Sequence, residues 1–123
     1  MKMLELIAYE YLSAELDVPV VFLEPTVPEW EAVPEKYVLI KKLSEKNDNY
    51  LRSGSLALKS YAQTVYDAAV LDRAVRDAAD RMIELDGIAS AKLSSSYDSS
   101  DTTRKVNRYQ SVYDFVFYEQ EGE

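Results

Sequence analysis

Hydrophobic side chains recur at helical spacing between residues 60 and 87. Apolar positions return there every three or four residues, which is the pattern of a helix that buries one face. This face consists of Ala68, Leu71, Val75, Ala78, Ala79, Met82 and Leu85. Thr64 and Asp67 resemble a capping pair at the N-terminal end, and Gly87 is the expected C-terminal stop. We therefore predict that one long helix, fed by a strand, organises the core.

A second amphipathic helix is predicted over residues 3–16, where apolar positions again share one face. Pro19 ends this pattern, because the residue before a proline leaves the helical region and proline cannot continue the hydrogen-bond ladder. Residues 24–35 contain Pro25, Pro28 and Pro34 among acidic residues, without a basic side chain. That composition forbids regular structure and indicates a linker.

Short apolar runs and alternating patterns predict the extended segments. They cover residues 20–23, 36–43, 50–61, 88–97 and 106–118. Polar, turn-prone residues at 44–49 and at 98–104 separate the strands of two hairpins, and the first tip is expected to be long and mobile. Gly54 is expected to mark a bulge or a point of close approach.

The order of these elements is helix, short strand, two strands, long helix and two strands. The economical packing is an α+β fold, with a single, mostly antiparallel sheet of four or five strands and both helices packed on one face. The chain, residues 1–123, is expected to form this one domain, with the proline-rich segment 24–35 as a linker within it.

The last predicted strand carries Val112, Val116 and Tyr118 on one face and aromatic side chains on the other. The aromatic set is Tyr109, Tyr113, Phe115 and Phe117. Because helices cover only one face, a monomer would leave apolar side chains in water, and such a patch marks a contact surface. We therefore predict that the aromatic set lies between copies of the chain. Trp30 in the linker is expected either to anchor a partner chain or to fold back and cover the second face.

Candidate catalytic chemistry is sparse. The chain has no cysteine and no histidine, which excludes thiolate and imidazole schemes, and with three glycines it shows no phosphate-binding loop. Asp77, Asp80 and Glu84 alternate with arginines, as on a solvated ion-pair face. Asp98 and Asp101 are better explained as turn residues than as cation ligands. We predict no enzyme activity, no cofactor and no metal site.

The net charge of −8 argues against general nucleic-acid binding, because such binding needs basic surface. No apolar run is long enough to span a bilayer, and the N-terminal residues lack the continuous apolar region of a secretory signal. Basic residues gather near the two predicted hairpin tips. If both hairpins point the same way, they form one positive end that docks on an acidic partner, although edge-strand protection by lysine and arginine also explains them.

Three segments resemble the tail terminator or tail completion proteins, which are minor tail proteins of bacteriophages with long, non-contractile tails. They are Ser60-Tyr61-Ala62 at the end of a strand, Ala68-Ala69-Val70-Leu71 in the alanine-rich helix, and Arg108-Tyr109-Gln110 before the aromatic strand. The resemblance extends over nearly the whole chain.

This resemblance implies a non-enzymatic protein that forms a ring, usually a hexamer, on the finished tail tube. The ring stops tube polymerisation and presents the surface to which the filled head joins. Implied partners are further copies of the chain, the tail tube protein and the head–tail connector protein, with DNA passing through an acidic lumen without specific binding. The implied location is the head-proximal end of the virion tail, and the host cytoplasm during assembly. Residues near the hairpin tips become candidate contacts with the tube or the connector: Lys42, Lys46, Asp48, Arg104, Lys105 and Arg108.

Three other functions stay open from the sequence. A head completion or adaptor protein on the portal side would form a similar ring on the other partner. A small acidic module that binds one protein would be a stable monomer. A metal-dependent nuclease would require a divalent cation at Asp98 and Asp101.

Overall fold

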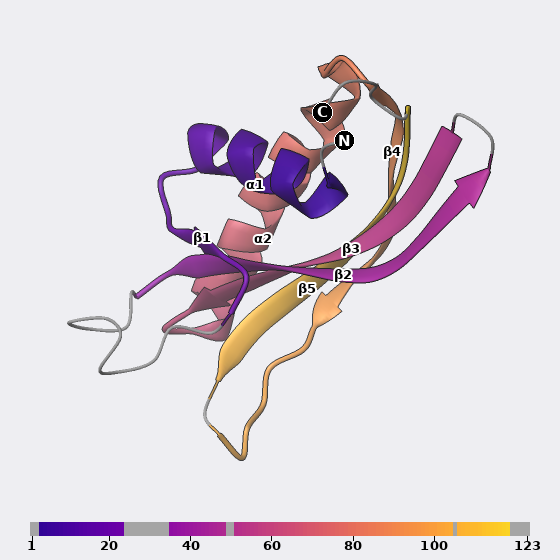
Figure 1. Ribbon diagram of the computed structural model, residues 1–123. Coiled ribbons are helices and arrows are strands. Elements are labelled where there is room, and N and C mark those ends of the chain that lie inside the picture. Colours follow the sequence, from indigo (N-terminus) through magenta and orange to yellow (C-terminus); the bar gives the residue numbers. More distant parts are fainter. Residues whose placement is uncertain (1–2, 24–34, 49–50, 105, 119–123) are drawn as a thin grey trace.

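The computed structural model describes residues 3–23, 35–48, 51–104 and 106–118 and has the α+β fold that the sequence predicts (Figure 1). The elements follow the predicted order along the chain. They are α1 (Leu4–Glu15), β1 (Val20–Val21), β2 (Tyr37–Asp48), β3 (Leu51–Ala62), α2 (Val65–Asp80), the short 3-10 helix η1 (Arg81–Glu84), β4 (Ile88–Asp98) and β5 (Asn107–Tyr118).

One sheet contains all five strands in the order β1-β2-β3-β5-β4. The pairing of β1 with β2 is parallel, and every other pairing is antiparallel. Both α-helices lie on the same side of this sheet, as Figure 1 shows. The predicted fold class is therefore confirmed in its element order, its single sheet and the placement of its helices.

The main core fills the space between the helices and the sheet. From α1, Leu4, Ala8 and Leu12 are fully buried, one turn apart along the predicted face. The sheet contributes Val38, Ile40, Leu56, Leu58, Tyr113, Phe115 and Phe117, and the helical side adds Leu71, Val75, Ala78, Ala79 and Met82. Small alanines on α2 let the helix lie close to these large side chains. A second, smaller cluster of Tyr37, Leu39 and Tyr61 lies apart from this core.

The two ends of the long helix follow the predicted chemistry. The Thr64 hydroxyl accepts a hydrogen bond from the backbone N–H of Asp67 at 3.0 Å, which satisfies one free donor of the first turn. The α-helix ends at Asp80, earlier than predicted, because the chain tightens into η1 before it turns. Gly87 then has a φ of 93°, a conformation that favours glycine.

The predicted hairpin tip at residues 44–49 is wrong. β2 and β3 stay paired from Tyr37↔Tyr61 to Asp48↔Leu51, so most of this polar segment is strand. A register shift between Lys42 and Ser44 inserts one extra residue into β2. The polar residues remain extended because the ladder pairs their backbone groups, which outweighs their turn propensity.

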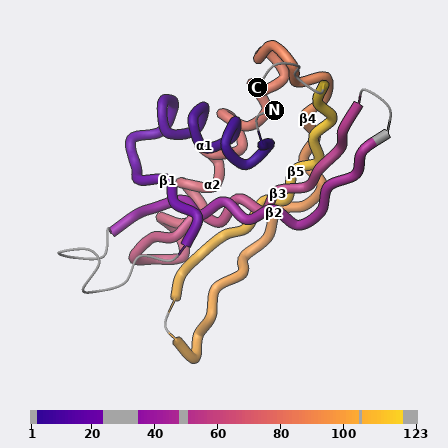
Figure 2. Tube along the Cα trace, viewed as in Figure 1, coloured from indigo at the N-terminus to yellow at the C-terminus, as the bar shows by residue number. Residues whose placement is uncertain are grey.

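The two hairpins extend in opposite directions, which contradicts the predicted single positive end. β3 and β5 are antiparallel, with Leu51 opposite Tyr118 and Ala62 opposite Asn107. The β2–β3 connection therefore lies beside the end of β5, whereas the β4–β5 connection lies beside the end of β3. Figure 2 shows the two hairpins leaving the body of the protein at different ends.

Gly54 lies at the predicted close approach, between the sheet and the start of α1. A Cβ atom at this position would lie 2.9 Å from Leu4 Cδ2 and 3.2 Å from the carbonyl oxygen of Ser44. Leu4 is fully buried and the carbonyl belongs to the neighbouring strand, so neither atom moves freely.

We predict that Gly54→Ala lowers the free energy of unfolding by about 1–3 kcal/mol through overpacking. Ser53→Ala is the matched control on the same strand, and it should change stability by less than about 0.5 kcal/mol. Urea denaturation of both variants measures the difference. Equal stabilities for the two variants would show that α1 does not press on β3 at this point.

Candidate functional site

The aromatic side chains of β5 do not form an exposed contact surface. Tyr113 and Phe115 are fully buried and Phe117 is 2% exposed, all three inside the core beneath the helices. These odd-numbered residues of β5 point toward α2. The helical layer therefore covers the rings that we expected a second chain to cover. The predicted interface role of Tyr113, Phe115 and Phe117 is therefore wrong. Tyr109 is half-buried near the start of β5, and Trp30 lies outside the described residues.

Tyr113 also makes polar contacts at its outer end. Its hydroxyl donates to Asp80 Oδ1 at 2.7 Å and lies 3.1 Å from the backbone carbonyl of Arg76. Burial of the ring and the nearby Asp80 carboxylate raise the pKa of Tyr113 far above its usual value. This strand residue therefore holds α2 both by packing and by hydrogen bonding.

The predicted tube or connector contacts do not lie together. Lys42 faces the helical side, where its amine lies 3.5 Å from Glu5 of α1 and 3.7 Å from Glu45. Lys46 is exposed on β2, and Arg104 is exposed in the β4–β5 connection at the opposite end. The side chain of Asp48 and the whole of Lys105 lie outside the described residues.

Arg108 organises the β4–β5 connection rather than projecting from it. Its Nε donates to the carbonyl oxygen of Ser99 at 2.8 Å, and its guanidinium lies 5.7 Å from the centre of the Tyr61 ring. The hydrogen bond connects the start of β5 to the residue that follows β4, and the cation–π contact connects it to the end of β3.

Asp98 and Asp101 act as turn residues, as the sequence indicates. Asp98 Oδ1 accepts the backbone N–H of Ser100 at 2.9 Å. Asp101 Oδ1 accepts the N–H groups of Thr103 and Arg104 at 3.0 and 3.1 Å. The hydrogen bonds from Ser100 hold the pKa of Asp98 below its usual value. The two carboxylates are therefore engaged with the local backbone.

Asp72 forms a buried polar cluster that the sequence does not reveal. The ion pair with Arg76 follows from their spacing and is present, at 3.0 Å. However, Asp72 is only 1% exposed and also accepts hydrogen bonds from Ser111 at 2.5 Å and from Ser96 at 3.0 Å. These serines are register partners on β5 and β4. One carboxylate thus connects α2 to two strands.

The sheet face turned away from the helices is basic, although the chain is acidic. We call it the open face. Alternation along the strands places Lys41, Lys46, Lys59, Lys92 and Arg108 on it. Asp114 is its one acidic side chain among the strand residues whose side chains are described, and the Ser55 hydroxyl donates to it at 2.5 Å. The same face also carries the half-buried Val112 and Val116, and at the start of β2 it holds the buried cluster of Tyr37, Leu39 and Tyr61.

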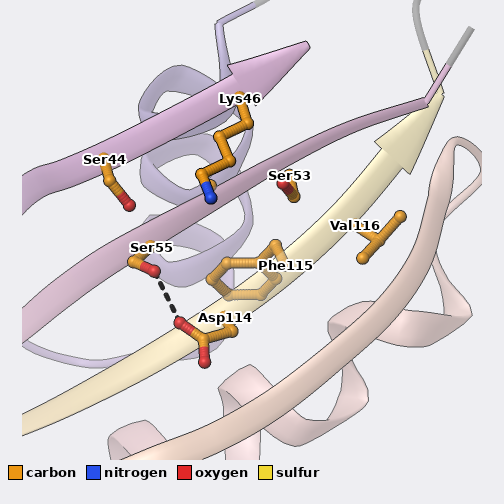
Figure 3. Close-up of a pocket in the computed structure, with 8 residues that line it drawn as sticks. Ser44, Lys46, Ser53, Ser55, Asp114, Phe115 and Val116 are labelled. Carbon is orange, nitrogen blue, oxygen red and sulfur yellow. Dashed lines mark hydrogen bonds between the residues drawn. The ribbon is translucent and has the colours of Figure 1, made fainter. Parts of the chain in front are cut away.

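A depression of about 240 Å³ lies at one end of the open face (Figure 3). It is lined by Ser44, Lys46, Ser53, Gly54, Ser55, Asp114, Phe115 and Val116. The Lys46 side chain extends from β2 over β3, toward the hydrogen-bonded pair of Ser55 and Asp114. The depression offers one cation, one carboxylate and several hydroxyls, a combination that suits polar contacts.

The helical side carries the opposite charge. Acidic residues outnumber basic ones on α1, α2 and η1, and α1 contains no basic residue. The acidic residues are Glu5, Glu10, Glu15, Asp67, Asp72, Asp77, Asp80 and Glu84, against Arg73, Arg76 and Arg81. The predicted ion-pair face is therefore part of a strongly acidic layer.

Comparisons with known proteins do not assign this arrangement. Neither a scan against protein-family models nor a search of curated proteins found a match to the chain. Within the described ranges, both α-helices fall short of the length and apolar character needed to cross a bilayer.

We predict that Asp72→Ala lowers the free energy of unfolding by about 2–4 kcal/mol, because it leaves Arg76, Ser96 and Ser111 without their shared acceptor. Asp77→Ala removes an exposed carboxylate from the same helix and should change stability by less than about 0.5 kcal/mol. Chemical denaturation followed by circular dichroism measures both. Similar losses in the two variants would contradict a structural role for the buried cluster.

The raised pKa of Tyr113 predicts a loss of stability at alkaline pH. The unfolded chain releases this proton near pH 10, whereas the folded chain retains it to higher pH. The unfolded state therefore binds fewer protons above pH 10, and stability falls as the pH rises.

Tyr113→Phe removes this titration, so its free energy of unfolding should fall less steeply than that of the wild type between pH 9 and 11. Tyr66→Phe is the control, since Tyr66 is 76% exposed. Urea denaturation across this pH range measures the slopes. Parallel slopes for the wild type and Tyr113→Phe would contradict the raised pKa of Tyr113.

Proposed function

We propose that this protein is a structural component of a long, non-contractile phage tail. It forms a ring, a hexamer, on the finished tail tube, ends tube polymerisation and offers the surface to which the filled head joins. The observation that carries this proposal is the pair of hairpins that leave one sheet at opposite ends.

A subunit placed between a tube and a connector needs contact surfaces on two sides. The β2–β3 hairpin supplies one, with the exposed Lys46 near its end, and the β4–β5 hairpin supplies the other, with the exposed Arg104. Because the two hairpins lie at opposite ends of the sheet, they do not form the single positive end expected from the sequence. This arrangement supports a protein that meets a different partner at each end.

The edges of the sheet support assembly with further copies. Within the described residues, β4 has a strand neighbour only on its β5 side, and β1 covers β2 only at Val38 and Leu39. Long open edges expose backbone donors and acceptors, which proteins normally cover. Head-to-tail contacts that close into a ring would cover them without forming fibres.

The local roles of the carboxylates support a non-enzymatic protein. Asp98 and Asp101 hold their own turns, and Asp72 joins α2 to the sheet. In this proposal the partners are copies of the chain, the tail tube protein and the head–tail connector protein. DNA passes through the lumen without specific binding, and the protein resides at the head-proximal end of the tail after assembly in the host cytoplasm.

Purified tail tube protein from the parent phage provides the direct test. Addition of this protein to polymerising tubes should shorten them and place a ring at one end, which electron microscopy measures. Unchanged tube length together with binding to the connector would indicate instead an adaptor protein on the head side. A stable monomer that binds neither would favour a small acidic binding module.

We predict that Lys46→Glu and Arg104→Glu separate the two contacts. One variant should bind the tube protein about tenfold more weakly, and the other should bind the connector protein about tenfold more weakly. Each variant should keep its other affinity unchanged, because the two residues lie at opposite ends. Biolayer interferometry with immobilised tube and connector proteins measures both affinities. Each variant serves as the control for the other, and loss of the same affinity in both would contradict a two-sided arrangement.

A further inference from the structure

We propose that the depression on the open face binds a glutamate side chain of a partner polypeptide, together with a backbone N–H group of the same partner segment. This inference deepens the proposed function and rests on it only for the identity of the partner, which would be the tube or the connector protein. The chemistry of the site comes from the residues that line the depression and from an apolar surface beside it.

The Lys46 amine is the cation of this depression. Within the part of the chain that the structure describes, it has no ion-pair partner, whereas Lys42 on the same strand lies 3.5 Å from Glu5. The Lys46 side chain is exposed and extends from β2 over β3, as Figure 3 shows. Its ammonium group is therefore available to a carboxylate from another molecule.

Two serine hydroxyls lie beside this amine. Ser53 is the register partner of Lys46, and Ser44 lies two residues before Lys46 on the same face of β2. Both serines line the depression, and in the described ranges neither hydroxyl has a hydrogen-bond partner. A carboxylate accepts hydrogen bonds at both of its oxygens, so an ammonium group with neighbouring hydroxyl donors suits it.

Asp114 forms the other side of the depression. It is exposed on β5 opposite Ser55, whose hydroxyl donates to Oδ1 at 2.5 Å and so orients the carboxylate. Lys92 is its register partner on β4, but among the described residues the two form no ion pair. Because a carboxylate accepts several hydrogen bonds, Asp114 retains capacity for an N–H donor from another molecule.

An apolar flank, formed by Leu51, Val116 and Tyr118, continues the open face beside these polar groups. Leu51 and Tyr118 are register partners and are 42% and 52% exposed. Val116 lies two residues before Tyr118, so alternation places it on the same face, where it also lines the depression. A contiguous apolar patch beside polar groups is typical of a contact with a protein.

A polypeptide satisfies all of these features at once. Its glutamate carboxylate meets Lys46 and the serine hydroxyls, a backbone N–H donates to Asp114, and the neighbouring apolar side chains cover the apolar flank. A nucleic-acid backbone carries negative charge at its phosphates, so Asp114 would repel it and the apolar flank would stay in water. The geometry therefore favours a peptide segment with a glutamate between apolar residues.

The test uses two matched peptides and the full chain. The probe is acetyl-Leu-Glu-Leu-amide, and acetyl-Leu-Gln-Leu-amide is its uncharged counterpart. Nuclear magnetic resonance titration of the isotope-labelled protein measures both affinities. The glutamate peptide should shift the backbone signals of Ser44, Ser53 and Val116, and it should bind about fivefold more tightly than the glutamine peptide.

Two variants assign the contacts. Lys46→Gln should bind the glutamate peptide about fivefold more weakly. Lys41→Gln is the matched control and should keep the affinity, because Lys41 is exposed on the same face of β2 but does not line the depression. Asp114→Ala removes the N–H acceptor and should also weaken peptide binding about fivefold. It should not weaken the binding of acetate, which has no N–H group. The spectra also show whether each variant is folded.

Three results would overturn the inference. They are equal affinities for the two peptides, equal weakening by Lys46→Gln and Lys41→Gln, and tighter peptide binding by Asp114→Ala, which would indicate a site for simple anions. Binding of duplex DNA that is lost in Lys46→Gln and kept in Lys41→Gln would assign the depression to nucleic acid instead. Peptide binding by a protein that does not cap tubes would leave this site standing and overturn the proposed function, whereas tube capping without peptide binding would do the reverse.

Discussion

The packing of a single helical layer on one face of the sheet determines the rest of this structure. The alanine-rich face of α2 lies against Tyr113 and Phe115, and Asp72 and Asp80 reinforce the contact with hydrogen bonds to β4 and β5. Because Tyr113, Phe115 and Phe117 are buried on this face, they need no second chain to cover them. The opposite face buries only the smaller cluster of Tyr37, Leu39 and Tyr61, and its lysines are opposite in charge to the acidic helical layer.

Much of the fold is readable from the sequence because it depends on local patterns. The period of the apolar positions predicts both helices, Thr64 predicts the start of α2, and Gly54 marks the close approach to α1. The length of β2 is not readable in this way, since residues 44–48 have turn-prone side chains and are extended only because β3 pairs with them. The direction of the hairpins likewise depends on the antiparallel pairing of β3 with β5, which joins segments far apart in the chain.

The candidate site shows the same division. Alternation correctly groups Tyr113, Phe115 and Phe117 on one face of β5, but it does not show which face the helices cover. The interface prediction is wrong because the helices cover the face that carries these three residues. The Asp72 cluster needs Ser96 and Ser111 to be register partners, a fact that spacing within one element does not contain. The separation of positive and negative charge onto two sides also follows only from the topology. These long-range placements, rather than any motif, carry the functional argument.

We propose that this protein ends tail tubes and joins them to heads. Electron microscopy of lysates from the parent phage, with the coding sequence for this chain deleted, tests it most directly. We expect filled heads lying apart from tails of uncontrolled length. Intact, infectious virions with tails of normal length would contradict it.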